Sequence, residues 1–140
     1  MIVTHDIGVI GEDAAVEYLR KNKYVILERN WHWHHFEVDI VACNKTHIVF
    51  VEVKTRSSLF GDKRPEEYVD DDKKRRVAQC ADIYVRMNHI LLSPRFDIIA
   101  VLLHKETYRP IDITHLEDAY DVPMRQSYHS SRSSYHRRRL

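Results

Sequence analysis

The chain has 140 residues, of which 44% are hydrophobic, so it can form one globular domain with its own core, and these values exclude a chain that is disordered throughout. No apolar run approaches the roughly 20 residues that a membrane-spanning helix needs, and the N-terminus lacks the regions of a signal peptide. Cys43 and Cys80 lie far apart in the sequence and indicate reduced thiols, so we expect a cytoplasmic protein without a membrane partner.

The formal net charge of +1 is unevenly distributed along the chain. Five of the 22 basic residues and none of the 21 acidic residues follow Asp121, so the first 121 residues carry 17 basic and 21 acidic side chains, a net charge of −4. A slightly acidic body excludes a protein that coats nucleic acid through charge alone. It is compatible with a carboxylate metal site that has local basic contacts.

The hydrophobic patterns predict an α/β domain that spans residues 1–120. Helices are predicted where apolar residues recur at a spacing of three to four, and strands where β-branched and aromatic residues alternate or form short apolar runs. The expected elements, whose main order is α-β-β-β-α-β, are a helix at 9–21, strands at 24–31, 36–43 and 47–54, a loop at 57–69, a helix at 73–88, a buried central strand at 95–103, a weaker strand near 107–113 and a short helical turn near 115–120.

Residues 121–140 form a basic tail that is rich in Ser, His and Arg and lacks apolar periodicity. We therefore expect this tail to be disordered. Its arginines and tyrosines would suit contacts with phosphates and bases. A solvated tail with no binding role is an equally good interpretation.

The predicted hairpin of strands 36–43 and 47–54 carries charged residues that alternation places on shared faces. If Asn44 faces His47 across the turn, paired positions sum to 91. Side chains of directly paired residues lie about 5 Å apart at their Cβ atoms. The charged pairs are then Asp39 with Glu52, and Glu37 with Lys54.

Two carboxylates so close would repel each other unless a positive group lies between them. We expect Asp39 and Glu52 to bind Mg²⁺, which prefers oxygen ligands, with the backbone carbonyl of Val53 as a further ligand. Lys54 would then act on the attacking water, as a polarising or deprotonating group, or would stabilise the charge of the phosphate. The metal would lower the pKa of bound water.

An amphipathic hairpin with one solvent-facing side is the alternative interpretation. Two features favour a metal site: the strand 47–54 is otherwise very apolar, and Glu12 lies on the same helix stripe as Ala15 and Leu19. A third carboxylate that faces inward would complete the cluster. Glu12 is otherwise explained as a first-turn acid favoured by the helix dipole.

A set of short motifs occurs in a specific order along the chain. They are Gly11-Glu12-Asp13-Ala14-Ala15, Tyr18-Leu19, Leu27-Glu28-Arg29-Asn30, Glu37-Val38-Asp39-Ile40-Val41-Ala42, Val49-Phe50-Val51-Glu52-Val53-Lys54-Thr55-Arg56, Phe60-Gly61, Lys73 and Arg95-Phe96-Asp97-Ile98. Over roughly residues 8–120 the chain therefore resembles the YraN-like family of small, poorly characterised bacterial proteins. That family is placed in the PD-(D/E)XK superfamily and is similar to archaeal Holliday-junction resolvases.

The resemblance implies a restriction-endonuclease-like core, with a mixed central β-sheet flanked by helices. It implies that Glu12, Asp39, Glu52 and Lys54 form the catalytic site of an endonuclease that uses Mg²⁺ or Mn²⁺ to hydrolyse DNA, with branched or structured DNA as the favoured substrate. A homodimer would fit, because a junction resolvase ordinarily needs two active sites. The alternatives are a nucleic-acid-binding module of this fold that cleaves little or not at all, and a partner-binding protein that uses its tail and the loop at 57–69.

Three further charged residues belong to the same motifs. Arg56 and Lys73 are candidates for contact with nucleic-acid phosphates, and their alternatives are a surface salt bridge for Arg56 and an exposed first-turn lysine for Lys73. Asp97 opens the buried strand at 95–103, so we expect a structural ion pair with a nearby arginine.

One segment departs from the family pattern. Phe36 stands where the family usually has Gly, and it follows Trp33 and the histidines His32, His34 and His35. These histidines raise the alternative of a zinc site. Alternation places His35 on the opposite face from the other two, so three ligands do not converge from one strand.

Overall fold

The computed structural model describes residues 4–57, 69–121 and 134–139. Within these segments the elements are α1 (Thr4–Lys21), β1 (Val25–Trp33), β2 (Phe36–Cys43), β3 (His47–Arg56), α2 (Asp71–Met87), β4 (Ser93–Leu103), β5 (Pro110–Glu117) and β6 (Ser134–Arg139). The predicted α/β class and the predicted order of the main elements are confirmed. No described helix is long and apolar enough to cross a membrane.

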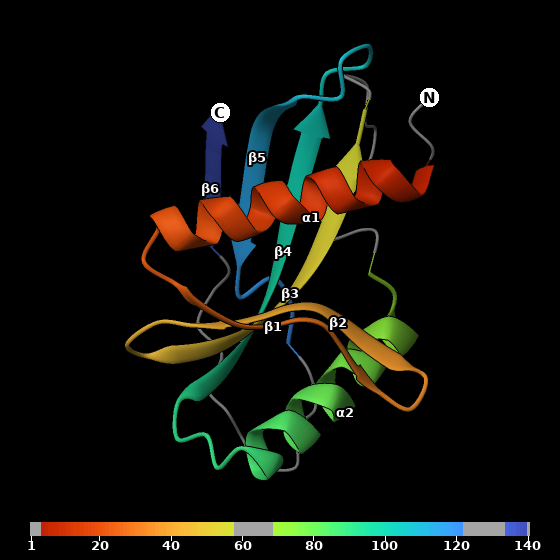
Figure 1. Ribbon diagram of the computed structural model, residues 1–140. Helices are drawn as coiled ribbons and strands as arrows, with labels where there is room; N and C mark the ends of the chain where they lie inside the picture. The colour runs from red at the N-terminus through yellow and green to blue at the C-terminus, as the bar shows by residue number, and fades with distance from the viewer. Residues whose placement is uncertain (1–3, 58–68, 122–133, 140) are drawn as a thin grey trace.

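The strands form one mixed sheet in the order β1-β2-β3-β4-β5-β6 (Figure 1). β3 and β4 run parallel, and the other neighbours run antiparallel. α1 crosses one face of the sheet over β3, β4 and β5, and α2 lies on the opposite face against β2 (Figure 1). This is the mixed sheet flanked by helices that the resemblance implied.

Each face of the sheet has its own hydrophobic core, because side chains alternate along the strands. Val49 and Val51 of β3 face α1 and pack against its buried stripe, which includes Leu19. Phe50 of β3 faces α2 and packs against the stripe that includes Tyr84. β3 is therefore buried on both sides, and a polar side chain on it needs a partner or a function.

The register of the β2–β3 hairpin is the one that the sequence predicted. Ile40 pairs with Val51, and the Asn44 N–H donates to the His47 carbonyl at 3.0 Å. The Lys45-Thr46 turn is tolerated because the side-chain oxygen of Asn44 accepts hydrogen bonds from the N–H groups of Thr46 and His47, at 2.9 and 2.8 Å.

The C-terminal third differs from the prediction in two places. The helical turn expected near 115–120 is wrong, because β5 extends to Glu117 and pairs Leu116 with Ile98 of β4. The tail expected to be disordered contains β6, which pairs with β5 along residues 134–139. Residues 122–133, and positions 58–68 of the expected loop at 57–69, lie outside the described residues.

α1 begins at Thr4, five residues before its predicted start. The extra turn is stabilised because Ile7 and Ile10, at a spacing of three, pack against the core on this face. The part of the helix that the prediction missed contains Gly8, and glycine is a poor helix former.

Candidate functional site

The candidate site lies where β2 and β3 part from each other. Their ladder ends at the pair Ile40–Val51. Beyond it, the N–H of Val53 donates to Asp39 Oδ2 at 2.8 Å, so a carboxylate takes the place of a ladder acceptor. The predicted strand pair of Asp39 with Glu52 is therefore not part of the ladder, although the two residues lie at its open end.

The Asp39 carboxyl group occupies a setting that disfavours its charge. Burial, followed by the neighbouring Glu52 carboxylate, raises the pKa of Asp39 to about 7, although the Val53 N–H and the charge of Lys73 act in the opposite direction. The charge of Glu52 therefore adds to the effect of burial in disfavouring a negative charge on Asp39. A hard divalent cation between them would relieve this repulsion.

The Val53 backbone contributes more than its N–H group. In an antiparallel ladder, a hydrogen-bonded residue directs its N–H and its C=O towards the same neighbouring strand. Because the Val53 N–H points at Asp39, the Val53 carbonyl faces the same opening between the strands. The predicted third ligand therefore lies on the correct edge of β3.

Glu52 is the buried carboxylate of the site, with an exposed fraction of 7%. Two ammonium groups approach its Oε1 atom: Lys54 Nζ lies 3.3 Å away, and Lys73 Nζ contacts the same oxygen directly. Lys73 is brought there by the start of α2, where Asp70 caps the helix and accepts from the Lys73 N–H at 2.8 Å. The sequence named both lysines, but their convergence on one oxygen was not foreseen.

Glu12 reaches the site from α1 and is held by β1. Its Oε1 atom accepts from Asn30 Nδ2 at 2.9 Å and from Arg29 Nε at 3.3 Å. Arg29 also pairs with Asp13. The charge of Glu12 contributes to the raised pKa of Asp39. Glu12, Asp39 and Glu52 do not converge as a set of three metal ligands, and no such group of three occurs among the described residues.

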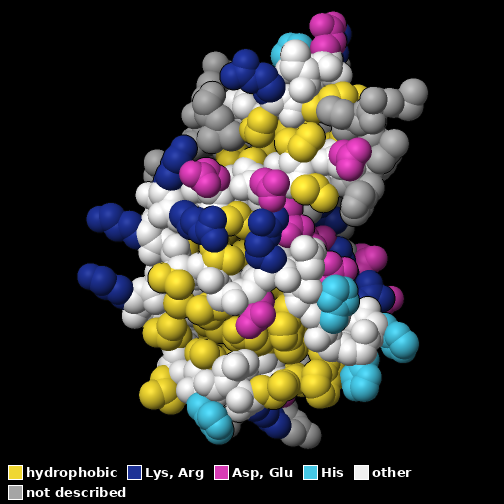
Figure 2. All heavy atoms as spheres, in the orientation of Figure 1, with side chains coloured by type: hydrophobic (Ala, Val, Ile, Leu, Met, Phe, Trp, Pro, Cys, Tyr) yellow, Lys and Arg dark blue, Asp and Glu magenta, His cyan; other side chains and the backbone are white. Residues whose placement is uncertain are grey.

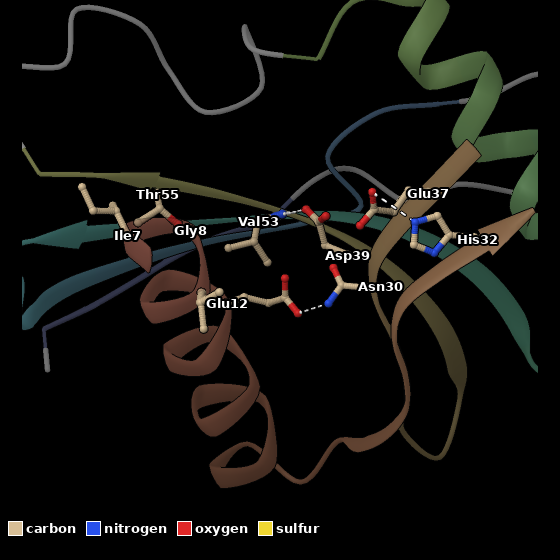
Figure 3. Close-up of a pocket in the computed structure, with 10 residues that line it drawn as sticks. Ile7, Gly8, Glu12, Asn30, His32, Glu37, Asp39, Val53 and Thr55 are labelled. Carbon is tan, nitrogen blue, oxygen red and sulfur yellow. Dashed lines mark hydrogen bonds and ion pairs between the residues drawn. The ribbon is translucent and has the colours of Figure 1, made fainter. Parts of the chain in front are cut away.

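A cavity of about 610 Å³ opens beside Asp39, between the first half of α1 and the strands (Figure 3). The side chains of Glu12, Asn30 and Asp39 point into it (Figure 3). Asn30 and His32 of β1 were missed as lining residues, although alternation places both on one face of their strand. Glu37, expected opposite Lys54, instead pairs with His32 across β1 and β2, where His32 Nε2 lies 3.6 Å from Glu37 Oε2.

The remaining histidines of this segment lie away from the carboxylates. His34 and His35 form the exposed turn between β1 and β2, and the ring of Trp33 packs edge-on against His34 with centroids 4.9 Å apart. Of the three histidines in this segment, His32 is the one that lines the cavity. The geometry of the described residues therefore gives no support to the zinc alternative.

Asp97 forms the structural ion pair that the sequence predicted. Arg95 Nε donates to its Oδ1 at 2.9 Å, His115 Nε2 lies 2.7 Å from its Oδ2, and the Asp118 N–H donates to Oδ1 at 2.9 Å. Tyr18 continues the network to the other His115 nitrogen at 2.9 Å. Because both carboxylate oxygens are satisfied inside the core, the network fixes α1 and β5 on β4.

Basic side chains do not dominate the face of the molecule shown in Figure 2. Among the coloured residues, Lys and Arg lie between Asp and Glu over α1, and hydrophobic side chains gather below them. Two of the candidate cations, Lys54 and Lys73, contact Glu52. Arg56, the other candidate, ends β3.

A hard divalent cation at the open end of β2–β3 would meet two carboxylates and one backbone carbonyl, although the described residues hold no group of three His, Cys, Asp or Glu that could bind a metal. Asp39 and Glu52 supply carboxylate oxygens, Val53 supplies a carbonyl that faces the same opening, and Lys54 and Lys73 provide the positive charge that now balances Glu52. Such a cation would have to displace Lys73 from Glu52.

Comparisons with known proteins agree on one family. The family model for "Uncharacterised protein family UPF0102" matches residues 11–101, a range that contains every candidate site residue. The chain is 48% identical to a UPF0102 protein of Parabacteroides distasonis, covering 86% of this chain and 97% of that protein. It is 43% identical to one of Bacteroides thetaiotaomicron, covering 86% and 96%, and 40% identical to one of Caldanaerobacter subterraneus, covering 81% and 93%.

Proposed function

The chain belongs to the uncharacterised protein family UPF0102, and we propose that it is a cytoplasmic, metal-dependent endonuclease that hydrolyses phosphodiester bonds in DNA. One observation carries the proposal: Asp39 lies at the open end of a hairpin, where burial and the Glu52 carboxylate disfavour its charge, and two lysines contact Glu52. Charge repulsion maintained in this way costs stability, and a bound cation would recover that cost.

In this proposal Asp39, Glu52 and the Val53 carbonyl hold Mg²⁺ or Mn²⁺. The ion would supply a water of lowered pKa and would neutralise charge on the phosphate. Lys54 already lies 3.3 Å from Glu52, so its ammonium group is placed to donate to an oxygen of a phosphate that lies beside the ion held by that carboxylate. Lys54 thereby stabilises the negative charge that develops during displacement.

Glu12 and its partners take a supporting role. Glu12 faces Asp39 across the cavity and is fixed by Asn30 and Arg29, so it is placed to orient water in the cavity through its second oxygen. In the same proposal, Lys73 and Arg56 contact phosphates of the DNA backbone. Branched or structured DNA is the proposed substrate, and a homodimer would supply the two sites that cutting both strands of a junction requires.

Cleavage of defined substrates tests the proposal. Linear, flapped and four-way-junction DNA are incubated with purified protein and Mg²⁺, Mn²⁺ or EDTA. Glu52→Ala is the inactive variant, and Glu17→Ala, which removes an exposed carboxylate from α1, is the matched control. We expect metal-dependent cleavage products with the wild type and with Glu17→Ala, and no products with Glu52→Ala. Products that persist in Glu52→Ala would assign the activity to another site or to a contaminant.

A second candidate function is a nucleic-acid-binding module that does not cleave. It is favoured by the direct contact of Lys73 with Glu52 and by the engagement of Glu12 with Arg29, which together satisfy the acids without a metal. Salt-dependent DNA binding by a wild-type protein that cuts none of the substrates, with either metal, would favour this module over the nuclease.

A further inference from the structure

Tyr120 has a buried hydroxyl group for which the structure offers no acceptor. Its exposed fraction is 8%, and its ring stacks on Phe96 with centroids 5.8 Å apart. The hydroxyl oxygen has no hydrogen-bond partner in the part of the chain that the structure describes. Buried hydroxyl groups are almost always paired, so an unpaired one needs an explanation such as a ligand.

The surroundings of this hydroxyl belong to the candidate site. Burial raises the pKa of Tyr120, and the Glu52 carboxylate is the next cause, ahead of Asp97. Tyr120 therefore lies within electrostatic reach of Glu52. Phe96 stacks in turn on Phe50, two residues before Glu52 on the same face of β3, so one row of rings joins Tyr120 to the strand that carries the site.

The first turn of α2 adds positive charge beside the ring. Lys74 Nζ lies 5.4 Å from the centroid of the Tyr120 ring, and the preceding residue, Lys73, contacts Glu52. Asp71 Oδ1 lies 3.9 Å from Lys74 Nζ, but Asp71 is largely exposed to solvent, so it screens this charge weakly. α2 is 17 residues long, and its N-terminus adds a partial positive charge in the same place.

We propose that Tyr120, Lys73 and Lys74 form a phosphate-binding subsite at the start of α2, in which the Tyr120 hydroxyl donates a hydrogen bond to a phosphodiester oxygen of the bound nucleic acid. This inference rests on the proposed function and adds a substrate-binding residue to the same site. A phosphate oxygen supplies the acceptor that the hydroxyl lacks, and the two ammonium groups balance its charge. Lys73 becomes available when Glu52 turns to a metal ion.

The Tyr120→Phe variant tests the subsite because it removes the hydroxyl and leaves the stacked ring. Binding of a fluorescein-labelled DNA duplex is measured by anisotropy in Ca²⁺, which takes the same oxygen ligands as Mg²⁺, so that affinity is measured without cleavage. We expect the dissociation constant to rise about tenfold, the value for one lost hydrogen bond to a charged group. The melting temperature should stay the same or rise, since the hydroxyl has no partner to lose.

Two further variants sharpen the result. Tyr84→Phe is the control, because its hydroxyl donates to Glu28 at 3.3 Å and lies on a later turn of α2; we expect its DNA affinity to match the wild type. Lys74→Gln should weaken DNA binding. It should also reduce the slope of the logarithm of the binding constant against the logarithm of the salt concentration by about one, because one ion fewer is released on binding.

The outcomes separate this inference from the proposed function. A Tyr120→Phe protein that binds and cuts DNA as the wild type does would overturn the subsite and leave the nuclease intact. A large fall in its melting temperature would also overturn the subsite, because the hydroxyl would then have a partner within the protein. A wild type that binds DNA, loses affinity in Tyr120→Phe and never cuts would keep the subsite and refute the nuclease. A wild type that neither binds nor cuts would refute both.

Discussion

The contact of α1 with β3 depends on a missing side chain at Gly11, so Gly11→Ala should destabilise the protein. A Cβ atom at this position would lie 1.8 Å from Thr55 Oγ1, 2.6 Å from Cγ2 and 2.7 Å from Cβ. Rotation of Thr55 moves its outer atoms but not its Cβ, so α1 must shift away from β3. Overpacking of this kind costs up to about 3 kcal/mol, against about 1 kcal/mol gained because Ala is the better helix former.

The expected net loss is about 2 kcal/mol, or roughly 7 °C in melting temperature for a chain of this size. Gly8→Ala is the matched control in the same helix, because nothing lies within 4 Å of an added Cβ there. Gly8→Ala should gain up to about 1 kcal/mol. Both values are measured by urea unfolding followed by circular dichroism.

A double variant shows whether Thr55 is the cause. Thr55→Gly removes all three contacting atoms, so Gly11→Ala in the Thr55→Gly background should cost nothing or should stabilise the protein. Thr55→Ala retains the Cβ at 2.7 Å and should rescue only in part. Equal effects of Gly11→Ala and Gly8→Ala in the wild-type background would refute the close packing of α1 on β3.

Three further outcomes follow from the charges and caps of the site. Because the folded-state pKa of Asp39 is raised to about 7, Mn²⁺ affinity measured by titration calorimetry should fall about tenfold per pH unit below that value. For the same reason, the metal-free protein should lose stability as the pH rises from about 4 to about 7, which urea melts across this range measure. Asp97→Ala should cost about 3–5 kcal/mol in urea unfolding, since it removes the carboxylate that accepts two hydrogen bonds from the buried Arg95 guanidinium. Because the pKa of Asp97 is lowered in the fold, the wild type should lose this contribution as the pH falls below the ordinary aspartate range. Asp70→Ala should cost about 1 kcal/mol as a lost helix cap, and a weaker DNA affinity would accompany it if the cap positions Lys73.

Much of the site was visible in the sequence because it depends on local regularities. Alternation along two strands and a turn anchored by Asn44 are enough to place Asp39 and Glu52 at one end of a hairpin. The pairing of Asp97 with Arg95 follows from the same alternation, since the two side chains share a face of β4 two residues apart.

The other contacts join segments that lie far apart in the chain, and no periodicity encodes them. Lys73 was a candidate for phosphate contact, with an exposed first-turn lysine as the alternative, and its contact with Glu52 depends on where α2 begins relative to β3. The contact of Glu12 with Asn30 depends on the crossing of α1 over the sheet. β6 was missed because its sequence is polar and basic, and an added edge strand is held by backbone pairing with β5 more than by apolar side chains.

Tyr120 illustrates a different limit. The sequence placed it in a helical turn, and its packing beside Phe96 becomes visible only because β5 continues to Glu117 before the chain returns to Phe96. Burial without a partner is a property of the packed fold, so a hydroxyl of this kind cannot be identified from residue type or spacing.

The proposed metal site is tested most directly by titrating Mn²⁺ into the protein at about pH 8, where Asp39 is deprotonated, and measuring the heat of binding. The wild type and the Glu17→Gln control should bind the ion saturably with equal affinity, and Asp39→Asn should bind it at least about tenfold more weakly. Equal affinity of Asp39→Asn and the wild type, or no saturable binding by the folded wild type, would contradict a metal centre at the open end of β2 and β3.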